Sequence, residues 1–141
     1  MRTSTLTHSR DRPTIAQAVV AIAGVIHVLV GLAMLLVPLW FFATIGTFPP
    51  FNRHYTGDMG AFQLALGAGL LFAARAPAQY RLLIGSAAAG NLLHMLNHAY
   101  DALISRASLG FWLADTGPML VLTLALLLVS AGLLDGESLA S

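Results

Sequence analysis

Long apolar segments alternate with short polar ones along the chain. No charged residue occurs between Arg12 and Arg53, and the apolar run inside this interval covers residues 14–39, more than the ~20 residues that a membrane-crossing helix needs. Further apolar segments cover 58–75, 80–104 and 111–134. In lipid, backbone polar groups must be satisfied within each segment, which excludes an open sheet. We therefore expect an all-α integral membrane protein, a four-helix up-down bundle.

The arginines predict how this bundle is oriented. Arg53 and Arg106 lie on one side, and the remaining arginines lie on the other, namely Arg2, Arg10, Arg12, Arg75 and Arg81. Because arginine is retained on the cytoplasmic side, we expect both termini in the cytoplasm. The sequence thus predicts a multi-pass protein of a bacterial inner (plasma) membrane. Its domain is 14–135, between polar tails at 1–13 and 136–141.

Composition supports a lipid environment and excludes several functions. Of 141 residues, 57% are hydrophobic and 9% are charged, whereas soluble domains carry about 25% charged residues. With a net charge of +1, the chain has no basic surface for phosphates, so we expect no nucleic-acid partner. The absence of cysteine excludes disulfides, thiolate metal sites and cysteine nucleophiles.

Small residues recur at helical spacing within the apolar segments. The pairs are Gly24 with Gly31, Gly60 with Gly67, and Gly85 with Ala89. Small residues let helix backbones approach closely, which drives helix association in lipid. We expect packing within the bundle and consider a homodimer or homotrimer plausible.

The segment 80–104 carries a polar stripe that an apolar helix does not need. Asn91, His94, His98 and Asp101 fall within about 80° of one another on a helix, and Asn97 and Tyr100 lie nearby. Two imidazoles one turn apart can bind one metal ion from a single helix face. This spacing is common, so the prediction needs support from the other segments.

Depth along the helices provides that support. At about 1.5 Å per residue from the cytoplasmic ends, His27 and His94 lie about 20 Å deep and Gln63 about 18 Å. Asp58 and His98 lie about 25 Å deep, and Asp101 and Asp115 about 30 Å. Ionisable residues inside a membrane are costly and usually face the bundle interior. We therefore predict a polar pocket in the outer half of the bundle, to which all four helices contribute.

Some of these residues also have purely structural interpretations. His27 alone is often a hydrogen-bonded packing residue. Asp58 precedes an apolar run and could be an N-cap. Asp115 could cap the last helix, with Pro118 tolerated in its first turn. A capping role does not prevent a residue from also lining a site.

Such a pocket suits haem or a non-haem metal. His27 and His94 could hold haem b from both sides, or one of His54, His94 and His98 could be a single axial ligand. A non-haem site for iron or zinc would draw on nitrogen and oxygen ligands. Its candidate ligands are His54, His94, His98, Asp101 and, in an alternative set, Asp58.

The remaining polar residues have roles around that centre. Proton transfer suits carboxyl and phenol groups, and imidazoles could relay protons without any metal. The candidates for acid–base catalysis are Asp58, Asp115, Tyr55 and Tyr100. The candidates for substrate contact are Gln63, Asn91 and Asn97.

Two resemblances add expectations of their own. The four-segment pattern and the stretch Pro49 to Asp58 resemble uncharacterised actinobacterial four-helix membrane proteins, loosely grouped as DoxX-like. The stretches 53–57 and 81–86 are similar to those that enter the second and third helices of membrane-bound styrene oxide isomerases. They differ from that pattern in the adjacency of His54 to Arg53 and in the extra Ile84.

The isomerase resemblance implies a particular chemistry. In that family, the histidine ligates a ferric haem that acts as a Lewis acid on an epoxide. It implies that His54 is the ligand and that Gln63 lies near a substrate-contacting position. The family's catalytic tyrosine maps near His98 or Ala99 rather than onto Tyr100.

Taken together, the residues predict a membrane-embedded haem- or metal-dependent enzyme acting on a small lipophilic molecule. The reaction is expected to be of isomerase or oxidoreductase type, with the bilayer delivering the substrate. One alternative is a small transporter or proton-coupled carrier. Another is a structural membrane subunit that binds no cofactor.

Overall fold

The computed structural model describes residues 14–135, which form five helices and no strand. These are α1 (Ile15–Leu36), α2 (Pro38–Thr44), α3 (Arg53–Ala73), α4 (Arg81–Ile104) and α5 (Leu109–Ser130). The all-α prediction is confirmed for this range. Two of the helices, α1 and α5, are long and apolar enough to cross a membrane. The predicted tails at 1–13 and 136–141 lie outside the described residues.

The first apolar run is broken near its end. The sequence predicts one helix over residues 14–39, but α1 ends at Leu36 and the separate helix α2 begins at Pro38. Proline lacks the N–H that would continue the hydrogen-bond ladder, and it disfavours helical geometry in the preceding residue. Val37 accordingly leaves the helical region, with φ −133° and ψ 54°.

Two other helices begin earlier than hydropathy predicts. Helix α3 begins at Arg53 rather than residue 58, because the Asn52 side chain accepts a hydrogen bond from the Tyr55 N–H and caps the helix. Helix α5 begins at Leu109, with Ser108 as its cap. Side-chain capping satisfies N–H groups that the first turn leaves unpaired. Polar residues can therefore precede the apolar run within the same helix.

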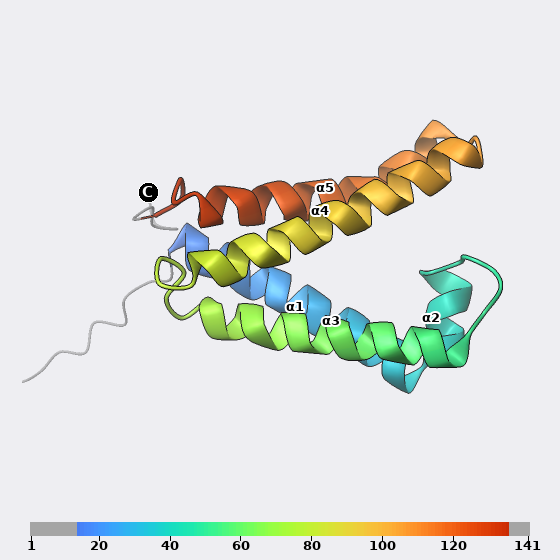
Figure 1. Ribbon diagram of the computed structural model, residues 1–141, viewed down its shortest axis with the longest axis horizontal. Helices are drawn as coiled ribbons and strands as arrows, with labels where there is room; N and C mark the ends of the chain where they lie inside the picture. The colour runs from blue at the N-terminus through green and yellow to red at the C-terminus, as the bar shows by residue number, and fades with distance from the viewer. Residues whose placement is uncertain (1–13, 136–141) are drawn as a thin grey trace, which may run out of the picture.

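The four long helices form two pairs (Figure 1). Helix α1 packs along α3, and α4 packs along α5. The pairs approach each other where α1 begins, α3 leads into α4 and α5 ends; we call this the closed end. They diverge toward the other end, where α2 lies and α4 leads into α5, which we call the open end.

Glycines set the close packing of the first pair. A Cβ on Gly24 would lie 3.0 Å from the Gly67 carbonyl oxygen, and one on Gly31 would lie 2.8 Å from that of Gly60. A Cβ on Gly67 would lie 2.7 Å from the backbone nitrogen of Val28. These backbone neighbours cannot rotate away, so the α1–α3 distance depends on the missing side chains. The predicted close approach is confirmed at these four glycines.

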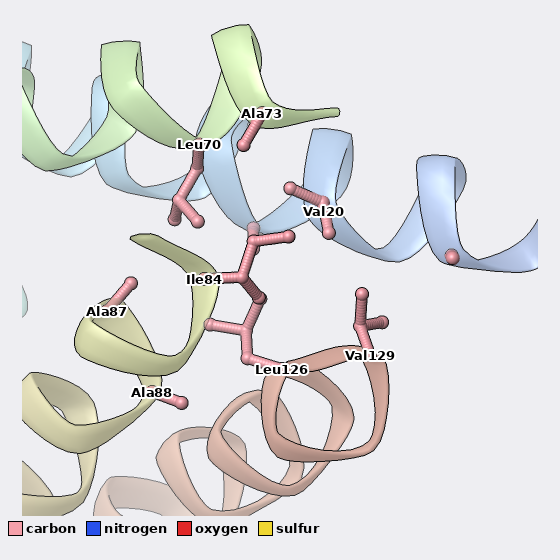
Figure 2. Close-up of a cluster of buried hydrophobic side chains, with 10 residues drawn as sticks. Val20, Leu70, Ala73, Ile84, Ala87, Ala88, Leu126 and Val129 are labelled. Carbon is pink, nitrogen blue, oxygen red and sulfur yellow. The ribbon is translucent and has the colours of Figure 1, made fainter. Parts of the chain in front are cut away.

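The hydrophobic core lies toward the closed end, because its residues come from the first turns of α1 and α4 and the last turns of α3 and α5. Figure 2 shows these side chains. All four long helices contribute side chains that face one another, namely Val20, Leu70, Ala73, Ile84, Ala87, Ala88, Leu126 and Val129. Val20, Leu70, Ile84, Leu126 and Val129 are completely buried. This core joins the two helix pairs at one end and leaves the open end to be held by other contacts.

Polar contacts fasten the same end. Thr14 and Gln17 form a capping box at the start of α1, and the Gln17 side-chain amide donates to the Arg75 carbonyl oxygen at 3.3 Å. The Arg81 guanidinium forms an ion pair with Asp135 beyond α5. Gly132, with φ +77°, provides the left-handed turn that ends α5 against Arg81.

We expect Gly67→Ala to lower the free energy of unfolding by about 1–3 kcal/mol, the usual range for overpacking. The new methyl group would press on the backbone of Val28 and Gly24. Gly90→Ala is the matched control, because no atom lies within 4 Å of its added Cβ, and it should leave stability unchanged or raise it by up to about 1 kcal/mol. Denaturant titration followed by circular dichroism measures both. Equal stabilities of the two variants would contradict this account of the α1–α3 contact.

Candidate functional site

The first polar cluster beyond the core joins three helices around His27. This imidazole on α1 is 4% exposed. Its Nδ1 donates to Oε1 of Gln63 on α3, and the Asn91 amide on α4 donates to its Nε2 at 3.3 Å. Both ring nitrogens are therefore engaged, which fixes the neutral, Nδ1-protonated form. In this arrangement neither nitrogen is available to ligate a metal or haem iron.

A second cluster lies farther along α4. The Nε2 atoms of His94 and His98 are 2.9 Å apart, and His98 Nδ1 lies 2.8 Å from Oδ2 of Asp115 on α5. Because a carboxylate only accepts hydrogen bonds, Nδ1 of His98 donates to it. In the neutral imidazole, its Nε2 then accepts from Nε2 of His94. The three side chains form a hydrogen-bonded relay, which we call the His94–His98–Asp115 relay.

Helical spacing tells which way the relay faces. Asn91, His94 and His98 are three and four residues apart, so they lie on one face of α4. Asn91 contacts His27 of α1, so this face is turned toward the first helix pair. Beyond that contact the two pairs diverge (Figure 1). His94 is exposed in this region, whereas the side chains of His98 and Asp115 are 16% and 17% exposed.

Asp115 lies inside a helix and does not cap one. Helix α5 begins six residues earlier, and its N-cap is Ser108, so the capping interpretation of Asp115 is wrong. Pro118 is likewise inside α5 rather than in its first turn, and it leaves the Ala114 carbonyl without an N–H donor from residue 118. A half-buried carboxylate in a helix interior needs a partner, and His98 provides it.

Asp58 also lies inside a helix, because α3 begins at Arg53 and is capped by Asn52. The capping interpretation is therefore wrong here too. Its Oδ2 lies 3.4 Å from Nε2 of His54, one turn earlier on the same helix face, and the two side chains are 57% and 89% exposed. This pair lies near the open end of α3 and is largely accessible.

The structure does not bring all the predicted site residues together. His54 contacts Asp58 on its own helix, and Asp101 lies 3.5 Å from the amide of Asn97 on its own helix. Neither pair joins the relay. His54 and Asp58 lie in the first two turns of α3, at the end where the helix pairs diverge, and Asp101 lies on α4 but pairs with Asn97 instead. A shared chamber that holds His54 and Asp58 together with His98 and Asp101 is not observed.

The two candidate catalytic tyrosines lie at the surface of the described part of the chain. Tyr55 and Tyr100 are 65% and 60% exposed, and their catalytic roles stay predictions. Within residues 14–135, no group of three or more His, Cys, Asp or Glu side chains is arranged to hold a metal ion.

One neighbour of the relay is not indicated by the sequence pattern. Phe48, in the loop between α2 and α3, packs edge-on against the His98 ring, with centroids 5.3 Å apart and an interplanar angle of 86°. An aromatic residue before Pro49-Pro50 gives no sign of such a long-range contact. Thr116, next to Asp115, is buried as well, and the sequence pattern does not indicate this either.

Comparison with protein-family models finds no match for this chain, and comparisons with curated proteins and with solved structures find none either. The site must therefore be interpreted from its own geometry.

We expect Asn91→Ala to lower the free energy of unfolding by about 1–3 kcal/mol, because His27 Nε2 would be buried without a donor. Asn97→Ala on the same helix is the matched control. Its amide is exposed and makes only the 3.5 Å contact with Asp101, so its effect should stay within about 0.5 kcal/mol. Chemical denaturation of the purified variants separates the two. A loss of stability in Asn97→Ala as large as in Asn91→Ala would argue against a special role for the His27 cluster.

Proposed function

We propose that this protein is a multi-pass membrane enzyme that transfers protons to and from a small lipophilic molecule at the His94–His98–Asp115 relay. The observation that carries the proposal is the relay itself: a carboxylate and two imidazoles in hydrogen-bonding sequence between α4 and α5. This arrangement provides acid–base chemistry without needing any other group.

Several features support a membrane location with four crossing helices. Helices α1 and α5 are long and apolar enough to cross a bilayer. Helices α3 and α4 have 21 and 24 residues, or about 32 and 36 Å at about 1.5 Å per residue, against a hydrocarbon core of about 30 Å. Large apolar side chains are widely exposed, among them Leu29, Phe62 and Leu93. A lipid environment accounts for this surface better than water does.

The arginines support one orientation. Arg75 and Arg81 flank the α3–α4 connection at the closed end, and Arg53 and Arg106 lie near the open end. With the N-terminal arginines preceding α1, the closed end and both termini would lie in the cytoplasm. The relay would then lie toward the outer face of a bacterial inner membrane.

The relay has a defined direction. In the neutral form Asp115 accepts from His98 Nδ1, and His98 Nε2 accepts from His94 Nε2, which leaves His94 Nδ1 as a base. A substrate proton taken up at His94 Nδ1 is balanced by transfer of the His94 Nε2 proton to His98. The His98 Nδ1 proton then passes to Asp115. The site gains one proton, and the negative charge moves from Asp115 to the substrate that has lost the proton, so the number of charges in the apolar surroundings is unchanged.

The same atoms support a metal-dependent variant of this function. The two Nε2 atoms face each other across 2.9 Å, and the Asp115 carboxylate behind His98 is the kind of partner that orients a metal-ligating imidazole. His94 and His98 would contribute two nitrogen ligands to a transition metal such as zinc or iron, and a substrate oxygen or water would complete its coordination. His54 and Asp101 would not belong to that set, and His27 would not serve as a haem ligand.

The topology can be tested with single cysteines, because the natural chain has none. We expect Thr47→Cys and Ala107→Cys, in the two connections at the open end, to react in intact cells with a membrane-impermeant maleimide. Gln79→Cys, in the α3–α4 connection, should react only after the membrane is permeabilised. Labelling of all three positions in intact cells would contradict the proposed orientation.

The reaction can be tested without knowing the substrate. Purified protein in nanodiscs is incubated in D2O with a hydrophobic extract of its host cells, and mass spectrometry follows deuterium uptake into small molecules. We expect compounds labelled by the wild type to lose that labelling by about 100-fold or more in His94→Ala and Asp115→Asn, as for loss of general acid–base catalysis. His54→Ala is the control and should retain it.

Metal analysis and the visible spectrum of the same preparations, made from cells supplied with haem, iron and zinc, test whether the reaction depends on a metal. A metal retained by the wild type and His54→Ala but lost in His94→Ala supports metal dependence. If labelling by the wild type and by His94→Ala is equal, the proposed reaction is wrong, and a carrier or structural role becomes the better interpretation.

A further inference from the structure

Phe48, in the loop between α2 and α3, contacts the relay between α4 and α5. Its ring meets the His98 imidazole edge-on at 5.3 Å between centroids. The His27–Asn91 hydrogen bond also joins the two pairs but lies nearer the closed end. Phe48 and His98 therefore make contact beyond that bond, where the pairs diverge (Figure 1).

The loop that carries Phe48 is held in place by aromatic residues around α2. The Gly46 N–H donates to the Phe41 carbonyl oxygen at 3.0 Å, and the Phe48 N–H donates to the Gly46 carbonyl oxygen at 2.9 Å. A Cβ on Gly46 would lie 2.8 Å from the Phe41 ring. Phe42 packs against Phe51 at 5.2 Å between centroids. These contacts fix the loop at both ends of its turn and present Phe48 to His98.

The relay residues differ in exposure in a way that agrees with this contact. His98 and Asp115 have side-chain exposures of 16% and 17%, whereas His94 is exposed. An aromatic edge against the imidazole also restricts rotation of that ring. Rotation would take Nδ1 away from Asp115 and Nε2 away from His94, and would interrupt the relay.

We propose that Phe48 is a positioning residue of the relay: it covers His98 and holds its ring with Nδ1 toward Asp115 and Nε2 toward His94. The inference builds on the proposed proton transfer and adds how the site is protected from water. Protons would then enter at His94 alone, and Phe48 would keep water from His98 and Asp115.

The test measures the reactivity of individual histidines toward diethyl pyrocarbonate, which modifies accessible, unprotonated imidazole nitrogens. The full chain in nanodiscs is treated briefly, and peptide mass spectrometry gives a rate for each histidine. His54, with an 89% exposed side chain, is the internal standard. In the wild type we expect His98, with a 16% exposed side chain, to react much more slowly than His54.

In Phe48→Ala the His98 rate should rise several-fold relative to His54. Phe48→Tyr keeps an aromatic ring and should restore the slow rate. Phe62→Ala is the matched control, because Phe62 is 72% exposed on α3, and it should leave the His98 rate unchanged. Nitrogen NMR of labelled histidine gives a second readout: His98 should be Nδ1-protonated in the wild type and a mixture of both tautomers in Phe48→Ala.

Equal His98 rates in the wild type and Phe48→Ala would overturn the inference, as would an equal rise in Phe62→Ala. These outcomes are independent of deuterium uptake. A shielded His98 in a chain that labels no substrate would disprove the proposed reaction and leave the role of Phe48 in place. Normal substrate labelling together with an unshielded His98 would disprove the role of Phe48 and leave the proposed reaction in place.

Discussion

Polar groups placed among apolar helices must find partners, and this requirement organises the described part of the molecule. His27, Asn91, His98 and Asp115 lie in helices whose other residues are largely apolar. Each of them is hydrogen-bonded to a residue on another helix. An unpaired polar group in such surroundings costs a few kcal/mol, so these bonds select the rotation of each helix about its axis. The hydrophobic contacts alone are far less selective.

Different kinds of contact hold the helices together at different levels along their length. Toward the closed end, apolar side chains from all four long helices form the core, and the Arg81–Asp135 pair fastens it. Along α1 and α3, glycines allow backbone contact. Beyond these, the two helix pairs are joined by the His27–Asn91 bond and by Phe48 on His98. The proposed reaction site therefore lies where the fold is held by a few specific contacts.

The relay also explains why Asp115 lies where helix preferences disfavour it. Aspartate is a poor residue for a helix interior, and Pro118 interrupts the hydrogen-bond ladder three residues after Asp115. A position that violates local preference and is stabilised by a partner on another helix is often a functional one. The same cannot be said of Asp58, which is exposed beside His54 at the start of α3.

Hydropathy and small-residue spacing predicted the all-α class, the approximate extents of the long helices and the close contact at Gly24, Gly31, Gly60 and Gly67, because these follow from local composition and the helical repeat. Depth counting also indicated which residues lie at similar levels. It could not tell that His98 faces Asp115 while His54 and Asp101 turn to neighbours on their own helices. Helix rotation, the divergence of the two pairs and the loop that brings Phe48 to His98 are decided by contacts between distant segments, and only the tertiary structure contains them.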